Sequence, residues 1–334
     1  MIGNIPFAIP NEFATGLANG SLVRIGTLLK ESGTGKIVAH VQESGIAQRL
    51  LSNVISSPFA SLDVLNIASS GYANIQLGHL TTMVEGLATL QKSLQVLQYA
   101  NLGISIAGIG VSVIGFAMMT KRLKSIEGNI SDLSNKLDHH FQDLFNRDLR
   151  AHYSQVYALL DKADIAQSLT NSSAELLSVS SHLGDESGFF HGEIAHLLEK
   201  DKFDEGLFVS FVRSLVLCDA GRIECLMQAN ELPAAHKTAS VIGRNYRALF
   251  DDISPFQIAN KVLPIKLDNH DYSKFRQRQT EMKTLVHGVR DITDAALTKP
   301  ALIETLIENN IEGRVYIDAI RREKEHPIIL FKPF

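Results

Sequence analysis

The sequence predicts a mainly α-helical protein with a very long central helix, a small N-terminal β-hairpin and a C-terminal helical domain. Apolar residues recur at alternating spacings of three and four from about residue 76 to 150, and no proline interrupts them. This heptad pattern is typical of a helix that packs along its whole length. Beyond residue 150 the pattern stays helical almost to the end, with breaks between helices expected at Gly184 and Gly188 and at Pro300. We therefore expect an arm with a hairpin and short helices at 1–75, the long helix at 76–150, and a helical regulatory or sensor domain at 151–334.

Two strand-like runs near the N-terminus predict the hairpin. They are SLVRIGTLL at 21–29 and KIVAHVQ at 36–42, and a turn containing Gly-Thr-Gly separates them. The GTGK of this turn is only part of a phosphate-binding loop, because Ile37 follows Lys36 where that motif needs Ser or Thr. The C-terminal PIILFKPF is expected to form an extended edge strand or a docking tail.

A run without charged residues lies inside the predicted long helix, between Lys92 and Lys121. Its most apolar part, Leu102 to Met119, approaches the roughly 20 residues that a bilayer-crossing helix needs. Small residues recur along it and would let helix backbones approach closely. We expect this segment to insert into a membrane. The residues expected to insert are Leu102, Gly103, Ile104, Ala107, Gly108, Gly110, Val111, Ser112, Gly115, Phe116 and Met119.

Lys121, Arg122 and Lys124 follow the run immediately, and basic residues in this position favour contact with anionic lipid headgroups on the cytoplasmic side. The N-terminus has neither a basic region nor a long apolar region of the kind found in signal peptides. We therefore expect cytoplasmic synthesis and association with a membrane, either permanently or after a trigger. The apolar length is marginal, so a buried helix of a soluble bundle remains an alternative.

The heptad stripe on either side of the run predicts association between copies of the chain. Membrane lipid and further copies are the expected partners, and a protein partner for 151–334 is a further expectation. The residues expected to mediate oligomerisation are Leu87, Leu90, Leu94, Leu97, Leu123, Ile126, Ile130, Leu133 and Leu137.

Composition argues against several other classes of protein. The net charge of −4 does not suit a general nucleic-acid binder, which would carry a basic patch. Cys218 and Cys225 are seven residues apart and are expected to be reduced core residues. His191 and His196 are five apart and would not share a helix face as zinc ligands do. We expect no metal and no cofactor.

One short pattern suggests an enzyme. Arg147 and His152 have the Arg-x4-His spacing and resemble the signature of HEPN ribonucleases, helical proteins that cleave RNA with such a pair. The resemblance implies catalysis by these two residues. Arg and His are also ordinary surface residues near the end of a helix, so an enzyme is the minority interpretation.

The long helix with a Gly-rich apolar middle resembles α-helical pore-forming toxins of the cytolysin A type, over residues 76–150. In that family an apolar segment is hidden in the soluble form and inserts during oligomerisation, which implies insertion of Gly103 to Met119 here. One departure is that the heptads continue through the segment, whereas those toxins carry it at a hairpin tip or terminus. The leading hypothesis is an oligomerising protein that perturbs or permeabilises a membrane, as a toxin or as a cell-suicide effector in bacterial defence. A soluble coiled-coil scaffold that bundles through 76–150 is the alternative, and a HEPN-like RNase is the second alternative.

Overall fold

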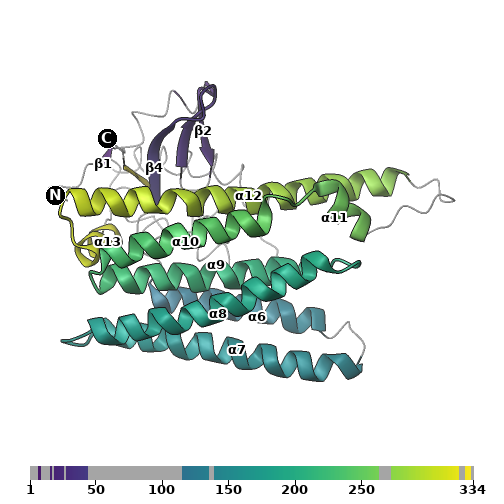
Figure 1. Ribbon diagram of the computed structural model, residues 1–334, viewed down its shortest axis with the longest axis horizontal. Coiled ribbons are helices and arrows are strands. Elements are labelled where there is room, and N and C mark those ends of the chain that lie inside the picture. Colours follow the sequence, from purple (N-terminus) through teal and green to yellow (C-terminus); the bar gives the residue numbers. More distant parts are fainter. Residues whose placement is uncertain are drawn as a thin grey trace, which may run out of the picture.

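A five-stranded sheet lies on one side of the long helix α12, and the other helices are stacked on its opposite side (Figure 1). This arrangement comes from a computed structural model. The structure describes residues 7–8, 16, 19–25, 28–43, 115–134, 139–262, 272–322 and 328–331. The prediction of a mainly α-helical protein with an N-terminal hairpin and a C-terminal helical region is confirmed.

Eight helices are present in these described ranges. In chain order they are α6 (Phe116–Ser134), α7 (His139–Ala166), α8 (Ser173–Glu199), α9 (Glu205–Gln228), α10 (Leu232–Phe250), α11 (Pro255–Val262), α12 (Tyr272–Glu308) and α13 (Gly313–Arg322).

Helix α9 is the centre of the bundle. Almost all of its residues are buried, because α6, α8, α10 and α13 pack around it (Figure 1). A helix that is apolar nearly all round needs such complete cover. Asp204 fixes where α9 begins, since its side chain accepts a hydrogen bond from the Leu207 backbone N–H at 2.9 Å.

The prediction of a single helix through residue 150 is wrong for the residues that the structure describes. Helix α6 ends at Ser134, a separate helix α7 begins at His139, and the two helices pack against each other. The Tyr157 hydroxyl donates to Glu127 at 2.9 Å. In one straight helix these residues would be about 45 Å apart, at 1.5 Å per residue. The heptad stripe of this region therefore forms a helical hairpin within one chain.

Two predicted helix breaks do not occur. Gly184 and Gly188 lie inside α8, and Pro300 lies inside α12. Pro300 removes a hydrogen bond to the carbonyl of Ala296, and at this turn α10 approaches α12 closely. A Cβ on Gly243 would be 3.1 Å from the Leu297 Cα. Tertiary packing therefore keeps α12 continuous across its proline.

The sheet joins the two ends of the chain. Its antiparallel order is β1 (Phe7–Ala8), β5 (Ile328–Phe331), β4 (Ile37–Glu43), β3 (Leu28–Glu31) and β2 (Leu22–Ile25). The predicted hairpin is present as β3 and β4, but the run 21–29 forms a second hairpin, β2 and β3. The C-terminal strand is interior rather than at the edge. Its partners β1 and β4 are distant in sequence, so no local pattern indicated this position.

Helix α13 is fixed to the end of α9 at its first residue. A Cβ on Gly313 would clash with the carbonyl oxygen of Met227, so only glycine allows this approach. The Gly313 N–H donates to the Asn230 side chain at 3.0 Å, and Asn230 follows α9 in the left-handed conformation with φ of 61°.

We expect Gly313→Ala to lower the free energy of unfolding by about 1–3 kcal/mol, because α13 must move away from a backbone carbonyl that cannot yield. Chemical denaturation measures the change. Gly188→Ala is the matched control: Gly188 is exposed on α8 with open space around it, so alanine should stabilise the helix slightly. Equal stability of the two variants would contradict the close contact at Gly313.

Candidate functional site

The uncharged run reaches the bundle at the start of α6, and we take this place as the candidate site. Phe116, the first residue of α6, is fully buried, and Met119 is 3% exposed. Gly115 immediately precedes the helix. The other predicted inserting residues, from Leu102 to Ser112, lie outside the described residues. The last part of the predicted membrane segment is therefore core in this structure.

The burial of Met119 results from four helices meeting at one glycine. A Cβ on Gly221 of α9 would be 2.9 Å from Leu183 of α8 and 3.8 Å from Leu160 of α7. It would also be 3.8 Å from the sulfur of Met119 on α6. The absence of a side chain at Gly221 lets these helices approach, so that Met119 packs inside the bundle.

The three basic residues after the run do not share one environment. Lys121 and Lys124 are exposed, as a contact with lipid headgroups requires. Arg122 is buried, with 7% of its surface exposed. The expected headgroup contact of Arg122 is therefore at odds with its position, because its direction around α6 points it into the bundle.

The described heptad residues are also covered by this same chain. Leu123 is fully buried, and Ile126 and Ile130 are each 5% exposed within the core of the bundle. They are not available to another copy in this structure, which corrects the prediction for these three residues. Leu133 lies on α6. The remaining predicted oligomerisation residues, outside the described ranges, are Leu87, Leu90, Leu94, Leu97 and Leu137.

A polar cluster lies near the start of α6, and no pattern in the sequence indicated it. Arg321 of α13 forms an ion pair with Glu224 of α9 and donates to the side chain of Gln167, after α7, at 2.8 Å. A Cβ on Gly115 would be 3.5 Å from the same guanidinium. We call Arg321, Glu224, Gln167 and Gly115 the Arg321 cluster. It joins α13, α9 and the end of α7 where the uncharged run meets the bundle.

The buried carboxyl of Glu224 has an unusual protonation equilibrium. Burial raises its pKa from 4.5 to about 7, while the Arg321 guanidinium opposes the rise. Between these values the folded protein holds a proton that the unfolded chain releases. This carboxyl therefore stabilises the fold at low pH, and the contribution is lost as the pH rises through 7.

We expect Glu224→Gln to remove this pH dependence. From pH 5 to pH 8 the wild type should lose up to about 3 kcal/mol of unfolding free energy relative to the variant. Urea denaturation across this pH range measures the difference. Glu175→Gln on α8 is the control, because the Glu175 side chain keeps 40% of its surface exposed and pairs with Lys162 at 2.8 Å. Parallel pH profiles of wild type and Glu224→Gln would show that Glu224 is ionised throughout.

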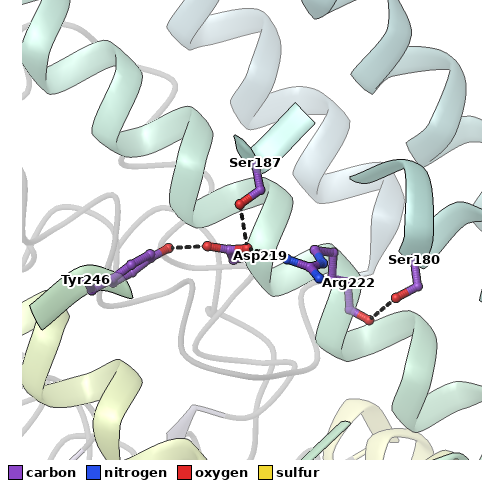
Figure 2. A network of polar contacts seen from close by, with 5 residues as sticks. All are labelled: Ser180, Ser187, Asp219, Arg222 and Tyr246. Carbon is purple, nitrogen blue, oxygen red and sulfur yellow. Dashed lines mark hydrogen bonds and ion pairs between the residues drawn. The ribbon is translucent and has the colours of Figure 1, made fainter. Parts of the chain in front are cut away.

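A second buried network joins α8, α9 and α10 (Figure 2). Asp219 of α9 accepts hydrogen bonds from Ser187 at 2.8 Å and from Tyr246 at 2.9 Å, and pairs with Arg222 at 3.4 Å. The Ser180 hydroxyl donates to the Arg222 carbonyl at 3.1 Å. Burial raises the pKa of Asp219, and the three contacts of its carboxylate oppose the rise. Both carboxylate oxygens are used by the protein, so this network fixes helix packing.

His152 of the candidate ribonuclease pair contacts helix α8. Nδ1 of His152 lies 2.8 Å from the carboxylate of Glu186, and its ring stacks on Phe189 with centroids 3.5 Å apart. Arg147 lies on the same helix, α7. The contacts of His152 join α7 to α8, which is sufficient to explain its presence.

Two expectations from the sequence concern membrane spans and metal sites, and the described residues bear on both. None of the helices in the described ranges is apolar enough over a sufficient length to cross a bilayer. In the same part of the chain, no three His, Cys, Asp or Glu residues are grouped to hold a metal ion. Cys218 and Cys225 are both buried free thiols.

In the sequence, Asp219 and Glu224 stand out as acidic residues within a stretch rich in apolar residues. Charged residues are almost never fully buried unless they are paired, so their position indicates partners on neighbouring helices. The identity of those partners depends on the fold. Comparison of the chain with known protein families, curated proteins and solved structures finds no match.

Proposed function

We propose that this chain is a membrane-acting α-helical protein, a toxin or cell-suicide effector, in which the helical bundle carries the uncharged run. The supporting observation is the burial of Phe116 and Met119, which gives the run a fixed attachment at the start of α6. A segment that perturbs a bilayer needs such an attachment to a stable body.

This attachment moves the proposed membrane segment toward the N-terminus. With Phe116 in the core, the uncharged stretch that remains for the membrane is Ser93 to Ile114. As a helix it would be roughly 33 Å long at 1.5 Å per residue, which suits a hydrocarbon core about 30 Å thick. The exposed Lys121 and Lys124 then lie less than three turns beyond the segment, within reach of headgroups.

The test is dye leakage from anionic liposomes, together with carbonate extraction of membranes from expressing cells. We expect Gly108→Leu to lower the leakage rate at least tenfold, because leucine separates helices that pack through small residues. Gly128→Leu is the matched control: Gly128 is exposed on α6 with open space around it. Its leakage should equal that of the wild type.

Two outcomes would reject the proposal. One is wild-type protein that is fully extracted by carbonate and causes no leakage. The other is equal leakage from Gly108→Leu and Gly128→Leu, which would show that the run is not the active segment.

A second candidate is a helical scaffold without membrane contact, in which Leu123, Ile126 and Ile130 stabilise the bundle of their own chain. In that case the rest of the heptad stripe, at 76–114, would mediate any bundling of copies. Sedimentation of the carbonate-extracted protein distinguishes the two functions, since a scaffold forms an oligomer that needs neither detergent nor lipid.

A further inference from the structure

The first half of α12 carries a row of basic side chains on its outer face. Its members follow one another at spacings of seven, four and three residues, and they are Arg276, Lys283, His287 and Arg290. At 3.6 residues per turn these spacings place all four along one line of the helix, over about 21 Å. All four residues are exposed. We call them the basic row.

The opposite face of α12 fixes the direction of the basic row. Met282, Val286 and Val289 are at most 1% exposed and belong to the core, because α12 packs against α10 and α11. The guanidinium of Arg290 donates to the carbonyl of Ile253, shortly before α11, at 3.3 Å. Packing of the apolar face therefore turns the basic row away from the bundle.

The sheet lies over the next part of the same line of α12. Asp294, four residues after Arg290, continues the line and pairs with Lys30 of β3 at 3.6 Å. The part of α12 that precedes this contact, beside α11, extends past the sheet (Figure 1). The described strands therefore leave the basic row uncovered.

The charges of the basic row are not neutralised by acidic side chains around them. Glu281 is the one acidic residue in the sequence from 272 to 290, and it pairs with Arg278 at 2.6 Å. Within the described part of the chain, no carboxylate forms an ion pair with Arg276, Lys283 or His287. In a chain with a net charge of −4, positive charge is thus concentrated on one exposed line.

An exposed aromatic ring flanks the beginning of the basic row. Phe256 of α11 is 52% exposed, and its ring packs edge-on against Phe275 with centroids 5.8 Å apart. Phe275 directly precedes Arg276. An apolar ring beside a row of cations suits a bilayer surface, because the ring enters the interface while the cations contact anionic headgroups. A nucleic-acid duplex offers phosphates to the cations but no apolar layer to Phe256.

From this combination we propose that α12 binds the surface of an anionic lipid bilayer through the basic row, with Phe256 in the headgroup layer. Charge complementarity supports this partner, and a straight row on an outer helix reaches a flat charged surface along its whole length. The contact goes beyond the proposed function, because it needs neither insertion of the uncharged run nor permeabilisation.

The experiment measures flotation of the full-length protein with phosphatidylcholine vesicles that contain or lack phosphatidylserine. The ratio of the two partition coefficients reports binding to lipid charge, because an apolar contribution from any other part of the chain is common to both. Each cation near an anionic surface contributes about fivefold to binding. We therefore expect Arg276→Gln/Lys283→Gln to lower the ratio by about tenfold or more. High salt should lower the wild-type ratio as well.

Lys237→Gln/Arg244→Gln on α10 is the matched control. These two residues are also seven apart on one helix, and both are exposed. Val241 lies between them on the same line, so they do not form part of a basic row. The control removes the same charge and should keep the ratio within about twofold of the wild-type value.

Phe256→Ala tests the aromatic ring separately. It should weaken partition into both kinds of vesicle several-fold and leave their ratio unchanged, since the contact of an apolar ring does not depend on lipid charge. Unchanged partition would overturn the placement of this ring in the headgroup layer.

Two results would overturn the basic row as a lipid contact. One is an equal loss from the α12 and α10 double variants, which would show that binding follows net charge alone. The other is tighter binding to a DNA duplex than to anionic vesicles at equal phosphate concentration, lost in the α12 variant, which would assign the row to nucleic acid.

The same vesicles separate this inference from the proposed function. Leakage without a charge-dependent ratio would overturn the basic row and leave the proposed function standing. A charge-dependent ratio that falls in the α12 variant, without leakage from any protein, would support the basic row and reject the proposed function.

Discussion

The need to cover α9 on every side organises this structure. A helix that is apolar nearly all round cannot lie at a surface, so α6, α8, α10 and α13 must all reach it. The two acidic groups on α9 determine where particular helices dock. Asp219 requires donors from α8 and α10, and Glu224 requires Arg321 from α13. An unpaired carboxylate at either position would be costly, so these contacts select one arrangement among several that would bury a similar apolar area.

The same packing places the described end of the uncharged run in the bundle. Phe116 and Met119 are buried, and α6 packs against α9. Hydrophobicity in the sequence does not single out these residues, since the run before them is also apolar. Packing against α9 is what makes Phe116 and Met119 part of the core.

The main errors of the sequence analysis have one physical cause. Gly184, Gly188 and Pro300 weaken a helix locally, yet α8 and α12 continue through them because contacts with neighbouring helices outweigh the local cost. The heptad stripe indicated one long helix, but periodicity records only which face is apolar. It does not record whether that face packs against another chain or against the next helix of the same chain. In this structure α6 packs against α7 of the same chain. The hairpin of β3 and β4 was predictable because its turn and both of its strands are adjacent in sequence.

The sequence by itself determined that the protein is mainly helical, that a hairpin lies near its N-terminus, and that a long uncharged run precedes a basic group. These properties follow from periodicity, turn residues and charge, which act over a few residues. Only the tertiary structure decided that β5 lies between β1 and β4, that Leu123 and Ile126 face their own chain, and that Arg321 reaches Glu224 and Gly115. Each of these depends on groups that are distant in the chain and meet only when the helices pack, and for that reason no local pattern could show them.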